Sequence, residues 1–331
     1  MQVATNAQAI DAAADGRRPG LPSGRRRLPR LALSGGKLLL SGGLIGYLLY
    51  RYGPGHARLE RLDPILGAIT VAIFVLQIAL NTVRWRLILR HIAGTDPPYR
   101  RLFGIYYASA FFSQVLPSIG GDLVRILYGR TFGSTSVPIL ISVFLDRGLA
   151  FASLLFVALP SLLFLTPFDP GHMVLRSVGL VAGSGLAAAY GGCLMVRAAR
   201  RSRIWTGLPQ WIQTLLASGD WSLTSRTALC CLIPLSAFVH LLSIAAIFLA
   251  AHAVHVPLTL SVALAIGPIL LLAQVLPISV GGWGVREAAA VALLAMTGVD
   301  ATSALLVSLM FGVLLVLSTL PGALFFLTLR E

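Results

Sequence analysis

Long runs of uncharged, apolar residues constrain this chain more than any other feature. They fall at about residues 31–50, 64–83, 103–119, 137–165, 173–196, 227–252, 258–280 and 300–328. Most reach the roughly 20 residues that a helix needs to cross a hydrocarbon core of about 30 Å. Lipid offers the backbone no hydrogen-bond partners, so these runs are expected to be helices. Only 11% of the residues are charged, against about 25% in soluble domains. The sequence therefore predicts an all-α, polytopic integral membrane protein.

The organisation of the chain follows from where its polar residues lie. Residues 1–30 are rich in Ala, Gly, Pro and Arg, and they are expected to form a disordered basic cytoplasmic tail rather than a signal peptide. No polar block in 31–331 is long enough for a soluble catalytic domain, so this range is predicted to be one membrane domain. The net charge is +14. Because the arginines cluster in the tail and in short connections, they indicate topology and contact with anionic lipid, and no nucleic-acid partner is expected.

An internal repeat is the most informative motif. Residues 114–125 read QVLPSIGGDLVR, and residues 274–286 read QVLPISVGGWGVR. The two copies share Gln, Pro, a Gly pair and Arg in the same order, with one inserted residue in the second copy. An apolar tetrapeptide can recur by chance, but this set of polar and helix-breaking residues indicates two related structural units.

The repeated residues predict a broken backbone inside the membrane. Proline removes a hydrogen-bond donor, and paired glycines permit a turn. Broken backbone at membrane depth survives only where protein covers it or where it lines a wet cavity. Each copy, near 103–130 and 262–290, is therefore expected to form a re-entrant or interrupted helix pair, alongside about six full transmembrane helices. Interrupted segments in corresponding positions of two halves are typical of transporter binding sites.

The distribution of arginine predicts how the two copies enter the membrane. The connections 84–101 and 197–226 each carry five arginines, which favours the cytoplasmic side for both. This arrangement requires the first copy to enter and return from the cytoplasm, and the second to enter from the opposite side. The copies would then form an inverted repeat in the cell membrane, with both termini cytoplasmic. Arg51, Arg58 and Arg61 do not fit, because this topology places them outside.

Six charged residues fall within the apolar runs, and a charge near the bilayer centre needs a partner or a function. They are Asp122, Arg125, Asp146, Arg147, Arg286 and Glu287. Their charges sum to zero, which suits a paired interior cluster that fixes helix packing. The second interpretation is a polar cavity at the repeat interface, where arginines bind an anionic headgroup through paired hydrogen bonds. Both interpretations can hold together.

Arg84, Trp85 and Arg86 follow Asn81 at the end of the second apolar run. They are expected to mark a helix end whose arginines extend to the interface beside an anchoring indole, or to capture lipid phosphate there. His240 is expected to hydrogen-bond another helix. The sequence shows no nucleophile–base pair, no Walker motif and no metal-ligand spacing. Accordingly, no catalytic residue, metal site or cofactor is predicted.

Several of these motifs, in order and spacing, resemble the lysylphosphatidylglycerol synthase transmembrane-region family, also called flippase-like. The matching residues are Asn81 with Arg84-Trp85, Pro117 with Gly120-Gly121-Asp122 and Arg125, Asp146-Arg147, and Pro277 with Gly281-Gly282-Trp283-Gly284 and Arg286-Glu287. The resemblance covers roughly residues 30–330. It implies an eight-helix-type membrane domain that handles lipids. The sequence lacks a C-terminal soluble aminoacyltransferase domain, so synthesis of a lysyl-lipid is not expected.

The expected function is translocation of a membrane lipid or lipid-linked intermediate, with an anionic headgroup between the two motifs and no covalent chemistry. The alternatives are a membrane transferase of glycosyl or aminoacyl type that acts on a lipid carrier, and a non-catalytic partner of a lipid-pathway enzyme. The expected partners are anionic phospholipids or lipid-linked headgroups; the sequence assigns no oligomeric state. The candidate binding residues are Arg84, Arg86, Gln114, Pro117, Gly120, Gly121, Asp122, Arg125, Asp146, Arg147, Gln274, Pro277, Gly281, Gly282, Trp283, Arg286 and Glu287.

Overall fold

The computed structural model describes residues 41–52, 62–116, 120–133, 135–168, 173–275 and 279–329. The predicted tail at 1–30 lies outside these residues, as do Pro117 and Pro277. Within them the chain is helical and contains no strand, which confirms the all-α prediction. After a helix at 41–52, the α-helices are α3 (Pro64–Ile92), α4 (Tyr99–Val115), α5 (Gly120–Gly129), α6 (Ser136–Leu165), α7 (Met173–Ala199), α8 (Arg203–Gly207), α9 (Gln210–Thr224), α10 (Ile233–Ala253), α11 (Leu260–Val275), α12 (Val285–Ala295), α13 (Ala301–Thr319) and α14 (Pro321–Thr328).

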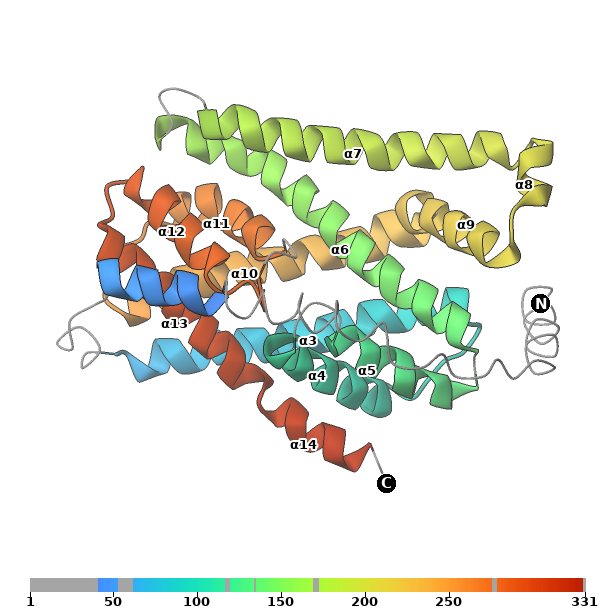
Figure 1. Cartoon of the computed structure of the whole chain (residues 1–331), viewed down its shortest axis with the longest axis horizontal. Helices are drawn as coiled ribbons and strands as arrows, with labels where there is room; N and C mark the ends of the chain where they lie inside the picture. Colours follow the sequence, from blue (N-terminus) through green and yellow to red (C-terminus); the bar gives the residue numbers. More distant parts are fainter. Residues whose placement is uncertain are drawn as a thin grey trace, which may run out of the picture.

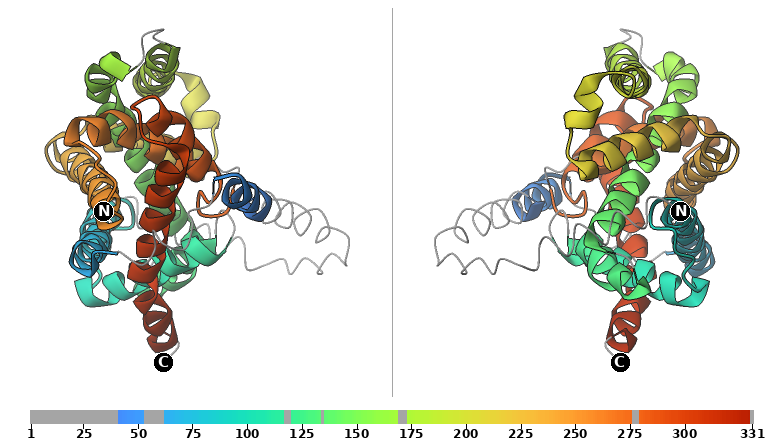
Figure 2. Two further views of the ribbon diagram at one scale, coloured as in Figure 1. Left: turned by 90° about the vertical axis from the view of Figure 1, so that its left-hand side faces the viewer. Right: turned by 90° about the vertical axis from the view of Figure 1, so that its right-hand side faces the viewer.

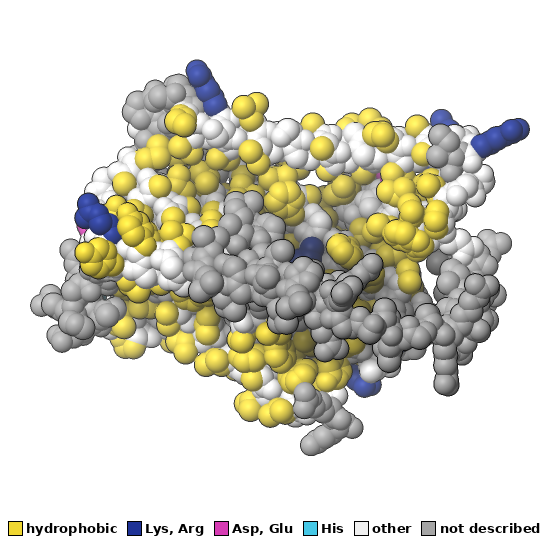
Figure 3. Space-filling view, in the orientation of Figure 1, with side chains coloured by type: hydrophobic (Ala, Val, Ile, Leu, Met, Phe, Trp, Pro, Cys, Tyr) yellow, Lys and Arg dark blue, Asp and Glu magenta, His cyan; other side chains and the backbone are white. Residues whose placement is uncertain are grey.

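Among the described residues, five helical segments are long and apolar enough to cross a membrane. They are α3, α6, α7, α10 together with the π-helical segment Ala228–Leu232 that precedes it, and α13 together with α14. The remaining predicted transmembrane helix, at the first apolar run 31–50, is described only from residue 41. Large apolar side chains cover the outer faces of these helices (Figure 3), and Leu163 and Leu180 are more than 70% exposed. Exposed apolar surface on this scale suits lipid rather than water, so the protein is a multi-pass membrane protein.

Local chemistry fixes where several helices begin. The Asp63 carboxylate caps α3 by accepting hydrogen bonds from the backbone N–H groups of Ile65 (2.9 Å) and Leu66 (3.2 Å). Asp300 caps α13 in the same way, accepting from the Ser303 N–H at 3.0 Å. A side-chain acceptor at this position satisfies N–H groups that have no partner inside the helix.

The long helices define two ends of the molecule (Figure 1). We call them the arginine-rich end and the opposite end. At the opposite end, α3 and α7 begin and α6 and α10 end. There the Asp63 N–H donates a hydrogen bond to the Ala253 carbonyl at 3.0 Å. At the arginine-rich end, α3 stops beside α9, where the rings of His91 and Trp221 stack 3.7 Å apart. Most of the arginine-rich connection 197–226 forms α8 and α9 at this end. Arg51 lies in the last described turn of the helix at 41–52 and is exposed.

Both repeat copies form helical hairpins. In the first, α5 runs back along α4, because Phe132 just after α5 lies beneath Arg101 near the start of α4, with the guanidinium 5.6 Å from the ring centroid. In the second, α12 runs back along α11, and Ala290 shares a small pocket with Leu270 and Leu271. Neither pair crosses the molecule as one straight helix (Figures 1 and 2).

The two hairpins point toward each other from opposite ends. The open end of the first packs with the start of α6 at the arginine-rich end. The open end of the second packs with the ends of α6 and α10 at the opposite end. Where they meet, a Cβ on Gly281 would lie 3.4 Å from Oε1 of Gln114, the penultimate residue of α4. This geometry agrees with the inverted arrangement expected from the repeat and the arginine distribution.

Candidate functional site

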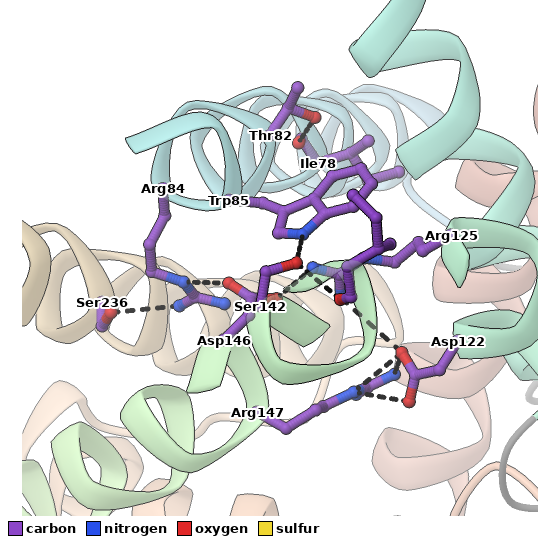
Figure 4. Close-up of polar contacts among 11 residues, drawn as sticks. Ile78, Thr82, Arg84, Trp85, Asp122, Arg125, Ser142, Asp146, Arg147 and Ser236 are labelled. Atoms are coloured by element: carbon purple, nitrogen blue, oxygen red, sulfur yellow. Dashed lines mark hydrogen bonds and ion pairs between the residues drawn. The ribbon is translucent and has the colours of Figure 1, made fainter. Parts of the chain in front are cut away.

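A buried ionic group, termed here the first ionic group, joins α3, α5 and α6 (Figure 4). It contains Arg84, Asp122, Arg125, Asp146 and Arg147. At its centre, Asp146 on α6 accepts a hydrogen bond from Arg84 Nε at 2.7 Å and lies 2.9 Å from Arg125 Nη2. Arg84, Arg125 and Asp146 are each less than 5% exposed. Buried charges at this depth are stable only when paired, and Asp146 supplies that pairing for two arginines.

The outer part of the group is a pair on α5 and α6. Asp122 receives hydrogen bonds from Nε and Nη2 of Arg147 at 3.0 to 3.2 Å, and it lies 3.6 Å from Arg125 Nη1. Arg147 is 57% exposed in the protein alone. Three arginines thus face two aspartates, so the group carries one positive charge in excess.

Arg125 is held between two aromatic rings. Its guanidinium carbon lies 4.3 Å from the ring centroid of Trp85 and 4.7 Å from that of Tyr106. Trp85 is fully buried, and its Nε1 donates to the Ser142 hydroxyl at 3.1 Å. The aromatic faces attract the cation without using its hydrogen-bond donors. Arg125 is therefore fixed in place with donors left over.

Arg125 lines a polar cavity and has buried donors without partners. Its Nε has no hydrogen-bond partner among the described residues, and its Nη2 approaches Asp146 without hydrogen-bonding geometry. The cavity has a volume of about 180 Å³ and lies between α3, α4, α5, α6 and α13. Its polar lining side chains are Gln77, Asn81, Tyr106, Ser109, Ser113, Gln114, Arg125, Arg147, Ser318 and Thr319. No acidic side chain of the described residues lines it.

A second ionic group lies in the other hairpin and is closed. Arg286 and Glu287 pair with each other, and both bond to the Ser308 hydroxyl. Glu287 also accepts from the Gly284 N–H at 2.5 Å, which caps α12. The Arg286 guanidinium lies 4.9 Å from the centroid of Trp283. Both charged residues are at most 3% exposed, so this group is neutral and enclosed.

These contacts correct two expectations. The six charged residues do not form one cluster: no ion pair or hydrogen bond in the described part of the chain joins the two groups. Arg84 and Trp85 do not mark an interfacial helix end, because both are buried, and Arg84 also donates to Ser236 at 3.0 Å. Arg86 alone behaves as a surface residue, pairing with Asp96 at 2.8 Å outside both groups.

The glycines shared by the two copies of the repeat permit close backbone approach and tight turns. A Cβ on Gly121 would overlap the side chain of Ser113, so this glycine lets α5 pack on α4. Gly281 and Gly282 have φ values of +58° and +81°, which side-chain-bearing residues rarely adopt. A Cβ on Gly282 would also press against Gln274. Gly120 is likewise crowded by Leu116.

Several cavity residues were not singled out from the sequence as site candidates. Gln77, Tyr106, Ser318 and Thr319 line the cavity from α3, α4 and the end of α13. Nothing in their local sequence distinguishes them from other polar residues on transmembrane helices. His240 makes the expected helix–helix contact, with its Nε2 2.9 Å from the Ala150 carbonyl. No group of metal-ligating side chains is present among the described residues.

Comparisons with known proteins give one match. Residues 36–322 match the family model described as the lysylphosphatidylglycerol synthase transmembrane region. No curated protein and no solved structure matches the chain significantly. The family match covers most of the chain, including both hairpins and both ionic groups. The chain therefore belongs to the lysylphosphatidylglycerol synthase transmembrane-region family.

Proposed function

We propose that this protein translocates a membrane lipid or lipid-linked intermediate, and that the anionic headgroup binds in the cavity beside Arg125. The observation that carries the proposal is a buried arginine with unpartnered donors that lines a polar cavity, where no acidic side chain of the described residues is present. A guanidinium suits a phosphate oxygen because it donates in a fixed planar geometry. The excess positive charge of the first ionic group would be balanced by one phosphodiester.

The two hairpins support a transport role. They approach each other at Gln114 and Gly281, and Gln114 also lines the polar cavity. In transporters built from inverted repeats, the substrate binds where the broken helices of the two repeats meet, and one repeat rocks against the other. The closed second group would act as the fixed partner in such a movement, with the first hairpin carrying the headgroup.

The orientation follows from charge. The arginine-rich end carries Arg86, Arg90, Arg100, Arg101, Arg130, Arg197, Arg200, Arg201, Arg203 and Arg226. The positive-inside tendency puts this end at the cytoplasmic face of the cell membrane. Both chain termini would then be cytoplasmic. The protein would act without covalent chemistry, alone or beside a lipid-pathway enzyme.

Reconstitution into vesicles tests this proposal. Vesicles would contain a fluorescent phosphatidylglycerol, and an impermeant quencher would report how fast labelled lipid reaches the outer leaflet. Arg125→Gln should slow translocation about tenfold or more, because a charge-assisted hydrogen bond contributes about 1.5–3 kcal/mol and each 1.4 kcal/mol is a factor of ten. Asp146 keeps its bond to Arg84 in this variant, so the fold should survive.

Arg90→Gln is the matched control, because Arg90 is an exposed arginine of α3 whose ion pair among the described residues is with Asp96. It should translocate lipid at the wild-type rate. Equal rates for wild type, Arg125→Gln and empty vesicles would contradict a translocase. A folded Arg125→Gln protein that translocates as fast as wild type would contradict the assigned site.

A further inference from the structure

Two side chains of α3 leave buried polar atoms without partners in the same cavity. Gln77 Nε2 and Asn81 Oδ1 have no hydrogen-bond partner among the described residues, and both residues line the cavity with Arg125. Gln77 is only 9% exposed. Residues four apart lie on one face of a helix, so the two amides are neighbours. An unpartnered donor and an unpartnered acceptor side by side indicate a ligand that satisfies both.

The chemistry of the two amides discriminates among headgroups. A hydroxyl can accept from the Gln77 amide N–H and donate to the Asn81 carbonyl oxygen at the same time. An ammonium group has no lone pair, so it would leave the Gln77 donor unsatisfied. It would also enter a cavity that borders an excess positive charge, where both nearby aspartates are already paired with arginines.

The size of the cavity limits the ligand to a headgroup. A volume of about 180 Å³ corresponds to roughly six water molecules at about 30 Å³ each. This space holds a phosphate with a short polyol, while the acyl chains would stay in the surrounding lipid. The serine and threonine hydroxyls of α4 and α13 that line the cavity offer further partners for a polyol.

We propose that the cavity selects anionic headgroups whose other polar groups are neutral hydroxyls, such as a phosphoglycerol or a phosphorylated sugar, over headgroups that carry an ammonium. Gln77 and Asn81 are the specificity residues, and Arg125 holds the phosphate. This inference rests on the proposed function only in taking the cavity as the headgroup site.

Binding of defined lipids to the purified full chain tests the inference without requiring transport. Phosphatidylglycerol and phosphatidylserine with the same acyl chains have the same net charge, but only the second carries an ammonium. Native mass spectrometry in detergent should show phosphatidylglycerol bound roughly tenfold more tightly. Equal affinity for the two lipids would overturn the inference.

Variants then locate the discrimination. Gln77→Leu should remove most of the preference for phosphatidylglycerol over phosphatidylserine. Binding of phosphatidic acid, which presents the phosphate alone, should fall far less than binding of phosphatidylglycerol, and it also reports a folded site. Asn81→Leu serves as an independent second variant. A preference that persists in folded forms of both variants would overturn the role of these amides.

Two further comparisons separate the possible failures. Water-soluble glycerol 3-phosphate should compete poorly; competition as strong as that by phosphatidylglycerol would overturn a lipid ligand. Selective binding without translocation in vesicles would refute the proposed function and leave the selectivity intact. Translocation without a preference between the two lipids would refute the selectivity alone.

Discussion

Arg125 and Arg286 occupy matching positions in the two copies of the repeat, yet their surroundings differ. Arg286 is paired within its own hairpin: it pairs with the adjacent Glu287, bonds to Ser308 and lies against Trp283. Arg125 lies between Trp85 and Tyr106 and keeps donors free beside a polar cavity. The same backbone motif can thus serve as a closed ion pair in one half of a protein and as an open cationic site in the other.

The difference arises from where each arginine finds its acid. Glu287 immediately follows Arg286, so that charge is neutralised within one hairpin. Arg125 depends on Asp146, which lies on another helix and is shared with Arg84. Because Arg84 and Arg125 share the single carboxylate of Asp146, the first ionic group keeps an excess of positive charge. The neighbouring helices therefore determine which copy of the repeat has its arginine paired within its own hairpin.

Loss of Glu287 is expected to have the largest effect on stability. Glu287→Gln would leave Arg286 as an uncompensated buried charge, and it would weaken the cap of α12. Removing one partner of a buried pair costs about 3–5 kcal/mol. Thermal unfolding in detergent, followed by loss of the monodisperse peak, should show a markedly lower midpoint. An unfolding midpoint equal to that of wild type would contradict the claim that Glu287 neutralises Arg286 in a closed ionic group, unlike the open group at Arg125.

A methyl group beside Arg286 should have an intermediate effect. A Cβ on Gly312 of α13 would overlap the Arg286 guanidinium and crowd the Trp283 ring. Overpacking of a buried site costs about 1–3 kcal/mol. Gly312→Ala should therefore lower the unfolding midpoint without changing headgroup binding. Gly148→Ala on α6 is a suitable control, because a Cβ there meets nothing within 4 Å.

The smallest effect is expected at the exposed pair outside both groups. Hydrogen bonds from Arg90, with the charge of Arg86, hold the pKa of the Asp96 carboxyl below its ordinary value. Any stability from this pair is present above the ordinary pKa and is lost as pH falls through the lowered one. Exposed ion pairs contribute little, so Asp96→Asn should leave the unfolding midpoint at pH 7 unchanged within error. A large shift would show that charge pairing alone, and not burial, controls stability here.

The sequence predicted the plan of the fold from a few residues. The repeated Pro and Gly-Gly pattern located both hairpins, and the arginines of 84–101 and 197–226 predicted that the hairpins enter from opposite ends. These features act locally or through charge counts, so they can be read without knowing which helices touch. The apolar runs placed the long helices for the same reason.

The partners inside the membrane could not be predicted in this way. Arg84 and Trp85 resemble an interfacial helix end, and only the packing of α3 against α6 brings them to Asp146 and Ser142. Gln77 becomes a candidate binding residue only because it lines a cavity together with residues of α4 and α13. The acid that neutralises a buried arginine depends on tertiary contacts, which a single sequence does not display.

The most direct measurement of the central claim is an experimental density map of the full chain in lipid discs that contain phosphatidylglycerol. Headgroup density is expected in the cavity, beside the Arg125 guanidinium, and none beside the closed pair of Arg286 and Glu287. Headgroup density beside Arg286 with an empty cavity at Arg125 would contradict the claim.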